Sequence, residues 1–271
     1  NLEGLLLGFV IGQIVLLMGE LILIIRSYPA TYLIAFDVFK KSNLYPSLFF
    51  VGFFYNAGVW VDKWMFWMNS GSGSDIIGPL HGSLIYDVPV FLSYLSLIPG
   101  MAIFLVRMET DFVEYYGKFY DGVREGGSLS YLEDMRNNMV RVIRQGIYQI
   151  LKIQVITVLL FITMAETVFT SLGISLLYLP LFKVQLVATT LQVVFLAIIN
   201  VFCYLDKRLI LVGLTCCFLI CNMIFTWISL QLGPQYFGFG FLLSLAVVVI
   251  IGLWQMHKRM QALEYETFML R

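Results

Sequence analysis

Five ionisable side chains lie inside apolar stretches of the chain, where a charge is costly. They are Glu20, Asp62, Lys63, Asp87 and Glu166. A charge at the centre of a bilayer costs roughly 2.5–3.5 kcal/mol on insertion scales, so such residues usually face a bundle interior or a water-filled cavity. Carboxylates placed there can attract cationic groups, and Glu20, which stands apart from the others, is our candidate for binding a coupling ion. These five residues are the first candidate site residues.

The pair Asp62 and Lys63 stands in "GVWVDKWMFW", a run rich in Trp, Val, Met and Phe. Because adjacent residues on a helix do not face each other, we expect the two side chains to find partners on different helices. Asp87 or Glu166 is the expected partner of Lys63. At about 100° per residue, two neighbouring stripes run along this helix. One stripe contains Asn56, Trp60, Lys63 and Trp67, and the other contains Tyr55, Asp62 and Phe66.

The two stripes allow two interpretations. Trp and Tyr rings stack on sugar rings and carboxylates attract cations, so the stripes could form the wall of a polar cavity that binds cargo. Alternatively, the residues are tied up in packing, or they lie at headgroup level in an aromatic belt. Under the first interpretation the cavity-lining candidates are Tyr55, Asn56, Trp60, Asp62, Lys63, Trp67, Asp87 and Glu166.

The sequence gives no support for covalent chemistry. It has no glycine loop that would cradle phosphate, and no Ser/His/Asp or paired-carboxylate pattern in any connection. Cys217 and Cys221 could share a helix face as soft metal ligands, but no His, Asp or Glu lies nearby in sequence to complete a site. We therefore expect neither an enzyme, a cofactor nor a metal site. With a formal net charge of zero, the chain also lacks the basic character of a nucleic-acid-binding protein.

The composition indicates whether these residues lie in a water-soluble protein or in a membrane. Of the 271 residues, 60% are hydrophobic and only 13% are charged, whereas soluble domains carry about 25% charged residues. Apolar stretches of about 20 residues, enough to cross the hydrocarbon core as a helix, recur along the whole chain. The sequence therefore predicts an all-α, polytopic helical membrane protein. Its seven predicted spans lie near 4–26, 47–68, 84–106, 147–170, 183–204, 209–231 and 236–257.

The basic residues predict the orientation of these spans. All 17 Lys and Arg residues except Lys63 and Lys183 fall at alternate connections and at the tail, on one side of the predicted membrane. The opposite connections, "MNSGSGSDIIGPLHG" and "LQLGPQYFG", contain no Lys or Arg. Positive-inside bias then places the start of the chain outside and its tail in the cytoplasm.

The third connection contains a basic amphipathic pattern, "SLSYLEDMRNNMVRVIRQGIYQILK". Its apolar stripe consists of Leu132, Met135, Met139, Val142, Ile143 and Ile147. Ser130 and Glu133 have the spacing of a capping box. We expect a separate helix on the inner headgroup surface; the alternative is a segment that only leads into the fourth span.

Three stretches resemble the C-terminal part of the PelG family. They are "SYPATYLIAFDVFKKSNLYPSLFFVGFFYNAGVWVDKWMFW", "HGSLIYDVPVFLSYLSLIPGMAIFLVRMETDF" and the tail "LEYETFML". The family comprises inner-membrane exporters of the Pel exopolysaccharide and is related to polysaccharide flippases with about twelve spans in two lobes. The resemblance carries no catalytic motif.

The resemblance has consequences for domains, cargo and partners. It implies that residues 1–26 are the last span of an N-terminal lobe in a longer protein. Residues 27–271 would be a flippase-like C-terminal lobe of six helices, with a cytoplasmic loop and amphipathic helix at about 107–146. It also implies export of an amino-sugar polysaccharide or its precursor across the bacterial inner membrane. The implied partners are the lipid bilayer, a cytoplasmic glycosyltransferase and membrane subunits that sense cyclic di-GMP.

Two other functions remain as alternatives. The chain could be a scaffold subunit that anchors a polysaccharide synthase through its arginine-rich loop. Seven spans with an outside start are also typical of receptors, but the third span is followed by "VRMETDF" in place of Asp-Arg-Tyr, and the seventh has no Asn-Pro-x-x-Tyr.

Overall fold

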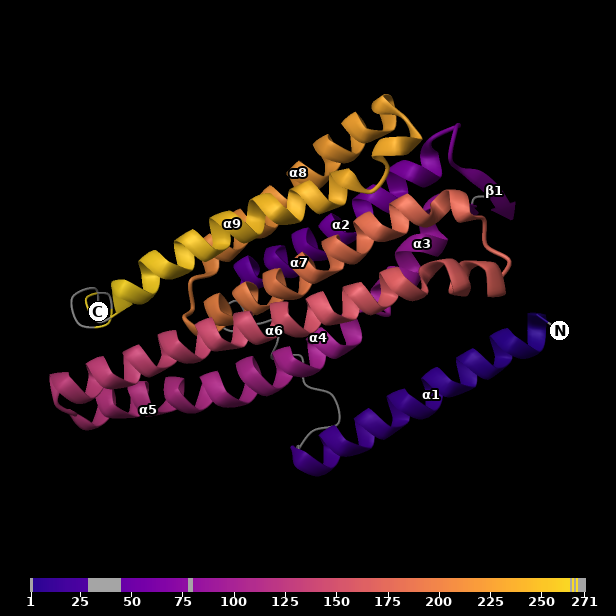
Figure 1. Ribbon diagram of the computed structural model, residues 1–271. Coiled ribbons are helices and arrows are strands. Elements are labelled where there is room, and N and C mark those ends of the chain that lie inside the picture. Colours follow the sequence, from indigo (N-terminus) through magenta and orange to yellow (C-terminus); the bar gives the residue numbers. More distant parts are fainter. Residues whose placement is uncertain (1, 29–44, 78–79, 264, 266, 268–271) are drawn as a thin grey trace. The chain divides into compact units, whose positions relative to one another are not determined.

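A computed structural model of the chain describes residues 2–28, 45–77, 80–263, 265 and 267 (Figure 1). The chain divides into two units, Asn1–Tyr45 and Pro46–Arg271. The first contains one helix, α1 (Leu2–Ser27), whose 26 residues are almost all apolar. At 1.5 Å per residue it is about 39 Å long, enough to cross a bilayer.

The second unit is a bundle of helices with one small antiparallel hairpin. Its elements are, in order, α2 (Pro46–Met68), β1 (Ser74–Ile77), β2 (Leu80–Gly82), α3 (Leu84–Tyr94), α4 (Leu97–Phe104), the π-helix η2 (Leu105–Asp111), α5 (Phe112–Glu125), α6 (Leu129–Ser171), the 3-10 helix η3 (Leu176–Tyr178), α7 (Leu179–Tyr204), α8 (Arg208–Leu232), the 3-10 helix η4 (Pro234–Tyr236) and α9 (Phe239–Gln261). The hairpin pairs Ser74 with Gly82 and occupies the polar connection after α2, where no strands were predicted.

The described helices confirm an all-α, multi-pass membrane fold. Five helical segments are long and apolar enough to cross a membrane, and a bent pair makes a sixth. The remaining predicted span, the second one at 47–68, corresponds to α2, which is 23 residues long but whose apolar run is interrupted by Asn56, Asp62 and Lys63. It packs along α8, which is one of the five. A crossing by α2 therefore stays a prediction.

Helix α7 lies at the centre of the second unit. It packs against α9, α3, α6 and α4, and 67% of its most apolar stretch is buried. Figure 1 shows it between α9 and α6. Its sequence is apolar on nearly all faces, with only a few small or amide side chains, as expected of a helix surrounded by others. Because lipid is as apolar as these side chains, close packing and interhelical hydrogen bonds hold such helices together.

Two glycines let α8 approach its neighbours closely. A β-carbon on Gly58 of α2 would lie 2.5 Å from the ring of Phe218, and one on Gly240 of α9 would lie 2.5 Å from the backbone nitrogen of Thr226. Between these positions the Asn222 amide donates to the carbonyl oxygen of Gly58 at 2.8 Å, and the Thr226 hydroxyl donates to Asn222 at 2.9 Å. Small residues and side-chain hydrogen bonds thus join α2, α8 and α9.

The third predicted span is broken. Helices α3 and α4 meet at a bend of 41°, and the helical path continues through η2 into α5. At the break the Ser96 hydroxyl donates to the carbonyl oxygen of Ser93 at 2.6 Å and lies 3.1 Å from the Thr189 hydroxyl of α7. The Ser96 hydroxyl is thus a second donor to the Ser93 carbonyl oxygen, which also accepts from the backbone nitrogen of Ser96 at 3.0 Å. The predicted span at 84–106 is therefore bent, and the helix continues beyond it to Glu125, where the first part of a cytoplasmic loop was expected.

The basic amphipathic segment is not a separate surface helix. It forms the first part of α6, a single helix of 43 residues, and α5 runs alongside it (Figure 1). Leu132, Met139 and Ile143 of its stripe are at most 2% exposed. Since α5 covers most of this stripe and the segment continues unbroken into the fourth span, the prediction of a separate surface helix is wrong and the alternative, a segment that leads into that span, is the one observed.

The predicted cap of this helix is also wrong. The N-cap is Ser128, whose hydroxyl accepts from the backbone nitrogen of Tyr131 at 3.3 Å, and Ser130 lies inside the helix. The αL conformation of Gly126 ends α5 two residues earlier, which lets α6 begin at Leu129.

Candidate functional site

A buried ion pair lies on α2. Asp62 is fully buried and Lys63 is 6% exposed. The Lys63 ammonium donates to both carboxylate oxygens of Asp62 at 3.2 Å and to the carbonyl oxygen of Val59 at 2.8 Å. The prediction that Lys63 pairs with Asp87 or Glu166 is wrong. Adjacent Cα–Cβ bonds diverge on a helix, but the flexible four-carbon stem of lysine lets its ammonium fold back to its neighbour.

Asp62 also reaches across the bundle to another helix, as predicted for it. The Tyr86 hydroxyl of α3 donates to Asp62 Oδ2 at 2.6 Å, and the Gln185 amide of α7 donates to the Tyr86 hydroxyl at 3.0 Å. The ring of Tyr86 stacks on Phe66 with centroids 3.8 Å apart. One polar chain of Lys63, Asp62, Tyr86 and Gln185 therefore joins α2, α3 and α7.

Aromatic rings surround the Lys63 ammonium on its other sides. Its Nζ lies 5.5 Å from the ring centroid of Tyr94 and 5.1 Å from that of Phe241 on α9. Both distances fall within the range of cation–π attraction. Lys63 is thus held by a carboxylate, a carbonyl oxygen and two rings. This is the setting in which a buried charge is tolerated, and removing one member of such a pair typically costs about 3–5 kcal/mol.

Asp87 belongs to a second, separate cluster. The Trp67 indole nitrogen donates to its two carboxylate oxygens at 3.0 and 2.9 Å, and the backbone nitrogen of Ser83 donates to Oδ2 at 2.9 Å. Asp87 lies in the first turn of α3, where the helix dipole favours a carboxylate. The Ser83 hydroxyl donates to the carbonyl oxygen of Ser72 at 2.8 Å. The cluster fastens the end of α2 to the start of α3.

The other candidates on α2 are dispersed. The Tyr55 hydroxyl accepts from the Gln192 amide of α7 at 3.4 Å, and the Tyr55 ring packs near Phe195 and Phe218. Asn56 is exposed and donates to the carbonyl oxygen of Gly52 on its own helix. Trp60 is 45% exposed and meets Trp67 edge to face. One stripe thus contains both exposed and buried side chains, so the predicted wall does not face a single environment.

Two of the predicted site residues lie on other helices. Glu166 is exposed on α6, and Glu20 is exposed on α1, in the unit described by itself. The thiols of Cys217 and Cys221 lie 3.8 Å apart on one face of α8. Within the described part of the chain, no group of three His, Cys, Asp or Glu side chains is arranged to hold a metal ion.

Sequence reasoning missed the amides and tyrosines that complete the site. Gln154, Gln185 and Gln192 are each at most 6% exposed, and each has a side-chain carbonyl oxygen with no hydrogen-bond partner among the described residues. An unsatisfied buried group of this kind costs about 1–3 kcal/mol. The signal was available, because Gln185 and Gln192 stand two helical turns apart inside an apolar span. Tyr86 gave no signal of its own beyond its position next to Asp87.

Comparison with known proteins gives one match. A family model described as "PelG: Putative exopolysaccharide Exporter (EPS-E)" matches residues 1–268. No curated protein and no solved structure matches the chain.

Proposed function

The chain belongs to the PelG family of exopolysaccharide exporters, and we propose that it moves a Pel-like amino-sugar polysaccharide, or its precursor, from the cytoplasm to the periplasm across the bacterial inner membrane. On this proposal it is a transporter and not an enzyme, and it lies with its tail in the cytoplasm. The family match and the apolar helices support export by a multi-pass membrane protein. The basic-residue asymmetry supports the orientation.

The buried pair of Asp62 and Lys63 is the observation that supports a direct role in transport. A charged pair in a membrane bundle is costly, and replacing such a pair by apolar residues is often neutral or stabilising. Packing alone therefore does not account for it. The pair, together with Tyr86 and Gln185, joins three helices, so a change in the Asp62 contacts would alter how α2, α3 and α7 fit together.

The cargo offers a chemical partner for Asp62. An amino sugar that carries a protonated amine resembles the ammonium of Lys63, so it can compete for the same carboxylate. In the structure Asp62 is fully buried, so the competition requires an opening. The break between α3 and α4, next to Tyr94, is the natural hinge for one. The buried glutamine oxygens that lack partners would then face hydrated cargo in the open state.

The same proposal includes partners at the cytoplasmic side. The helical hairpin of α5 and α6 carries Lys118 and Arg124 as exposed cations on α5. We assign this hairpin to contact with a cytoplasmic glycosyltransferase and with membrane subunits that sense cyclic di-GMP, the partners expected from the family.

Polysaccharide export in cells whose only copy of the protein is a variant tests the proposal. Asp62→Asn and Lys63→Met should each reduce export per membrane-inserted molecule, since each removes one charge of the network. Asp75→Asn, which changes an exposed carboxylate on β1 outside the proposed contact surfaces, is the matched control and should export normally. Normal export by both Asp62→Asn and Lys63→Met at wild-type abundance would refute the assignment of the site.

The long basic hairpin also favours a second candidate function, that of a scaffold subunit for a polysaccharide synthase. The two functions predict different partner binding by site variants that have lost export. If the chain is a transporter, a variant of the buried pair loses export but still binds its partner subunits. If it is a scaffold, a variant that loses export must also have lost its partner subunits. Co-purification of the partners with Lys63→Met distinguishes them. A receptor finds no support in the family.

A further inference from the structure

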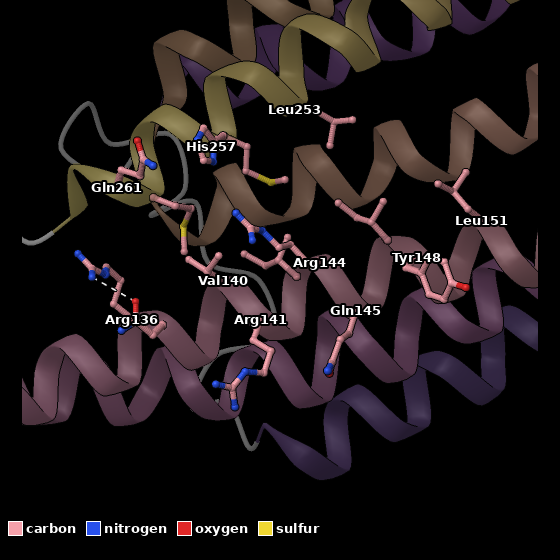
Figure 2. Close-up of a pocket in the computed structure, with 15 residues that line it drawn as sticks. Arg136, Val140, Arg141, Arg144, Gln145, Tyr148, Leu151, Leu253, His257 and Gln261 are labelled. Carbon is pink, nitrogen blue, oxygen red and sulfur yellow. Dashed lines mark hydrogen bonds between the residues drawn. The ribbon is translucent and has the colours of Figure 1, made fainter.

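An open groove lies between α6 and α9, away from the buried pair (Figure 2). Its volume is about 810 Å³. Helix α6 packs on α5, α4 and α7, while α9 packs on α8 and α7, so the two helices diverge on either side of α7 and leave the groove between them. Its lining comes from the stretch of α6 that begins at Arg136 and from the last turns of α9.

The groove is polar at one end and apolar at the other. Figure 2 shows Leu151 and Leu253 at one end, Arg136 and Gln261 at the other, and Arg144 between them pointing toward α9 near His257. Arg136 and Leu151 are 15 positions apart on α6, which corresponds to about 22 Å of helix. One leaflet of hydrocarbon is about 15 Å deep, so the groove is long enough for a headgroup and the upper part of an acyl chain.

The charge at the polar end has one sign. Arg136, Arg141, Arg144 and His257 line the groove, and none of the described residues that line it is acidic. Arg141 and Arg144 are exposed, so their guanidinium groups are available to a ligand. Guanidinium groups bind phosphate with paired N–H donors.

The apolar end continues onto the lipid-facing surface of the bundle. Beyond Leu151, the α6 side chains Val155, Ile156 and Leu159 are more than half exposed, and on α9 Ile250 and Trp254 are more than 60% exposed. A hydrocarbon chain leaving the groove therefore finds apolar surface on both helices. A soluble phosphate compound has no hydrocarbon chain that could cover Leu151 and Leu253.

We propose that this groove binds an anionic phospholipid of the bilayer, with the phosphate at Arg144 and His257 and an acyl chain along Leu151 and Leu253. Arg141, whose guanidinium points away from α9 in Figure 2, lies at the rim of the groove and attracts the headgroup from there. The lipid fills the space between α6 and α9. Each basic side chain near an anionic headgroup contributes a modest attraction.

Lipid binding by the purified, full-length protein tests the proposal. Native mass spectrometry in a zwitterionic detergent, with phosphatidylglycerol or phosphatidylethanolamine added in steps, gives the affinity for each. We expect preferential binding of phosphatidylglycerol. Arg141→Gln and Arg144→Gln should each weaken it roughly fivefold, and the double variant about thirtyfold. Arg124→Gln, the same substitution on α5 outside the groove, is the matched control and should bind as the wild type does.

A further variant tests whether the acyl chain occupies the groove, independently of the basic side chains. Leu253→Trp adds bulk at the apolar end without changing any charge, and it should also weaken phosphatidylglycerol binding. Equal phosphatidylglycerol binding by the wild type and the double arginine variant would overturn the proposal. The proposal would also be overturned if inorganic pyrophosphate bound without lipid and displaced phosphatidylglycerol, because the groove would then be a site for soluble anions. Preference for a polyprenyl diphosphate over phosphatidylglycerol would likewise overturn it.

Discussion

The ion pair of Asp62 and Lys63 makes a quantitative prediction about stability. Lys63→Met leaves a fully buried carboxylate whose one remaining side-chain donor is the Tyr86 hydroxyl. Stranding a buried charge in this way costs about 3–5 kcal/mol. In the double variant Asp62→Asn, Lys63→Met, the amide oxygen can still accept from Tyr86 and no charge remains. Its cost should therefore be much smaller, about 1 kcal/mol or less.

Unfolding of the purified protein in mixed micelles, titrated with a denaturing detergent, measures these differences. The wild type, the two single variants and the double variant form a double-mutant cycle, and from these costs we expect a coupling energy of at least about 2 kcal/mol. The matched control is the cycle of Glu114→Gln and Lys118→Met on α5. That pair joins a lysine and a carboxylate within one helix at 2.6 Å, but both partners are exposed, so we expect no measurable coupling. Additive effects at Asp62 and Lys63 would refute the buried-pair interpretation.

Three further predictions test the fold around the site. Gly240→Ala should destabilise the protein by about 1–3 kcal/mol, because its β-carbon would meet the backbone of Thr226, whereas Gly213→Ala, where nothing lies within 4 Å, should not; thermal unfolding measures both. Ser128→Ala should weaken the start of α6 by about 1 kcal/mol, seen as faster hydrogen exchange there, and Ser130→Ala should not. In a background without native cysteines, single cysteines in the connection 69–77 should label from the periplasm and those at 112–128 from the cytoplasm; the reverse pattern would refute the orientation.

Much of the fold could be predicted from apolar length and from charge. The stretches that form α1, α6, α7, α8 and α9 are long and mostly uninterrupted, so helical spans were the expected outcome. The bend between α3 and α4 had a sequence signal that was not used. Pro99 stands four residues after Leu95, so it cannot donate to the Leu95 carbonyl and its ring crowds that group, which interrupts the helix there. The contact of the Ser96 hydroxyl with Thr189 of α7, 93 residues away, was not predictable from the sequence. Likewise, the stripe of α6 indicated an amphipathic helix but not that α5 would cover it.

The site was predictable only in part. The cost of burying charge identified Asp62 and Lys63 correctly as buried residues. Their partners depended on side-chain reach and on tertiary contacts, since Lys63 folds back along its own helix and Gln185 is 99 residues from Tyr86. Asp87 was expected to be a partner of Lys63, yet its carboxylate accepts hydrogen bonds from the Trp67 indole and the Ser83 backbone nitrogen instead. Sequence separation is therefore a poor guide to which charges belong together.

Export by the double variant Asp62→Asn, Lys63→Met, compared with the wild type at equal membrane abundance, tests the central claim most directly. This variant removes both charges of the pair, so it should fold and insert normally. If the pair acts in transport, export of polysaccharide should fall sharply although the protein is stable. Normal export at normal abundance would contradict this account and would leave "GVWVDKWMFW" as a structural anchor in the membrane.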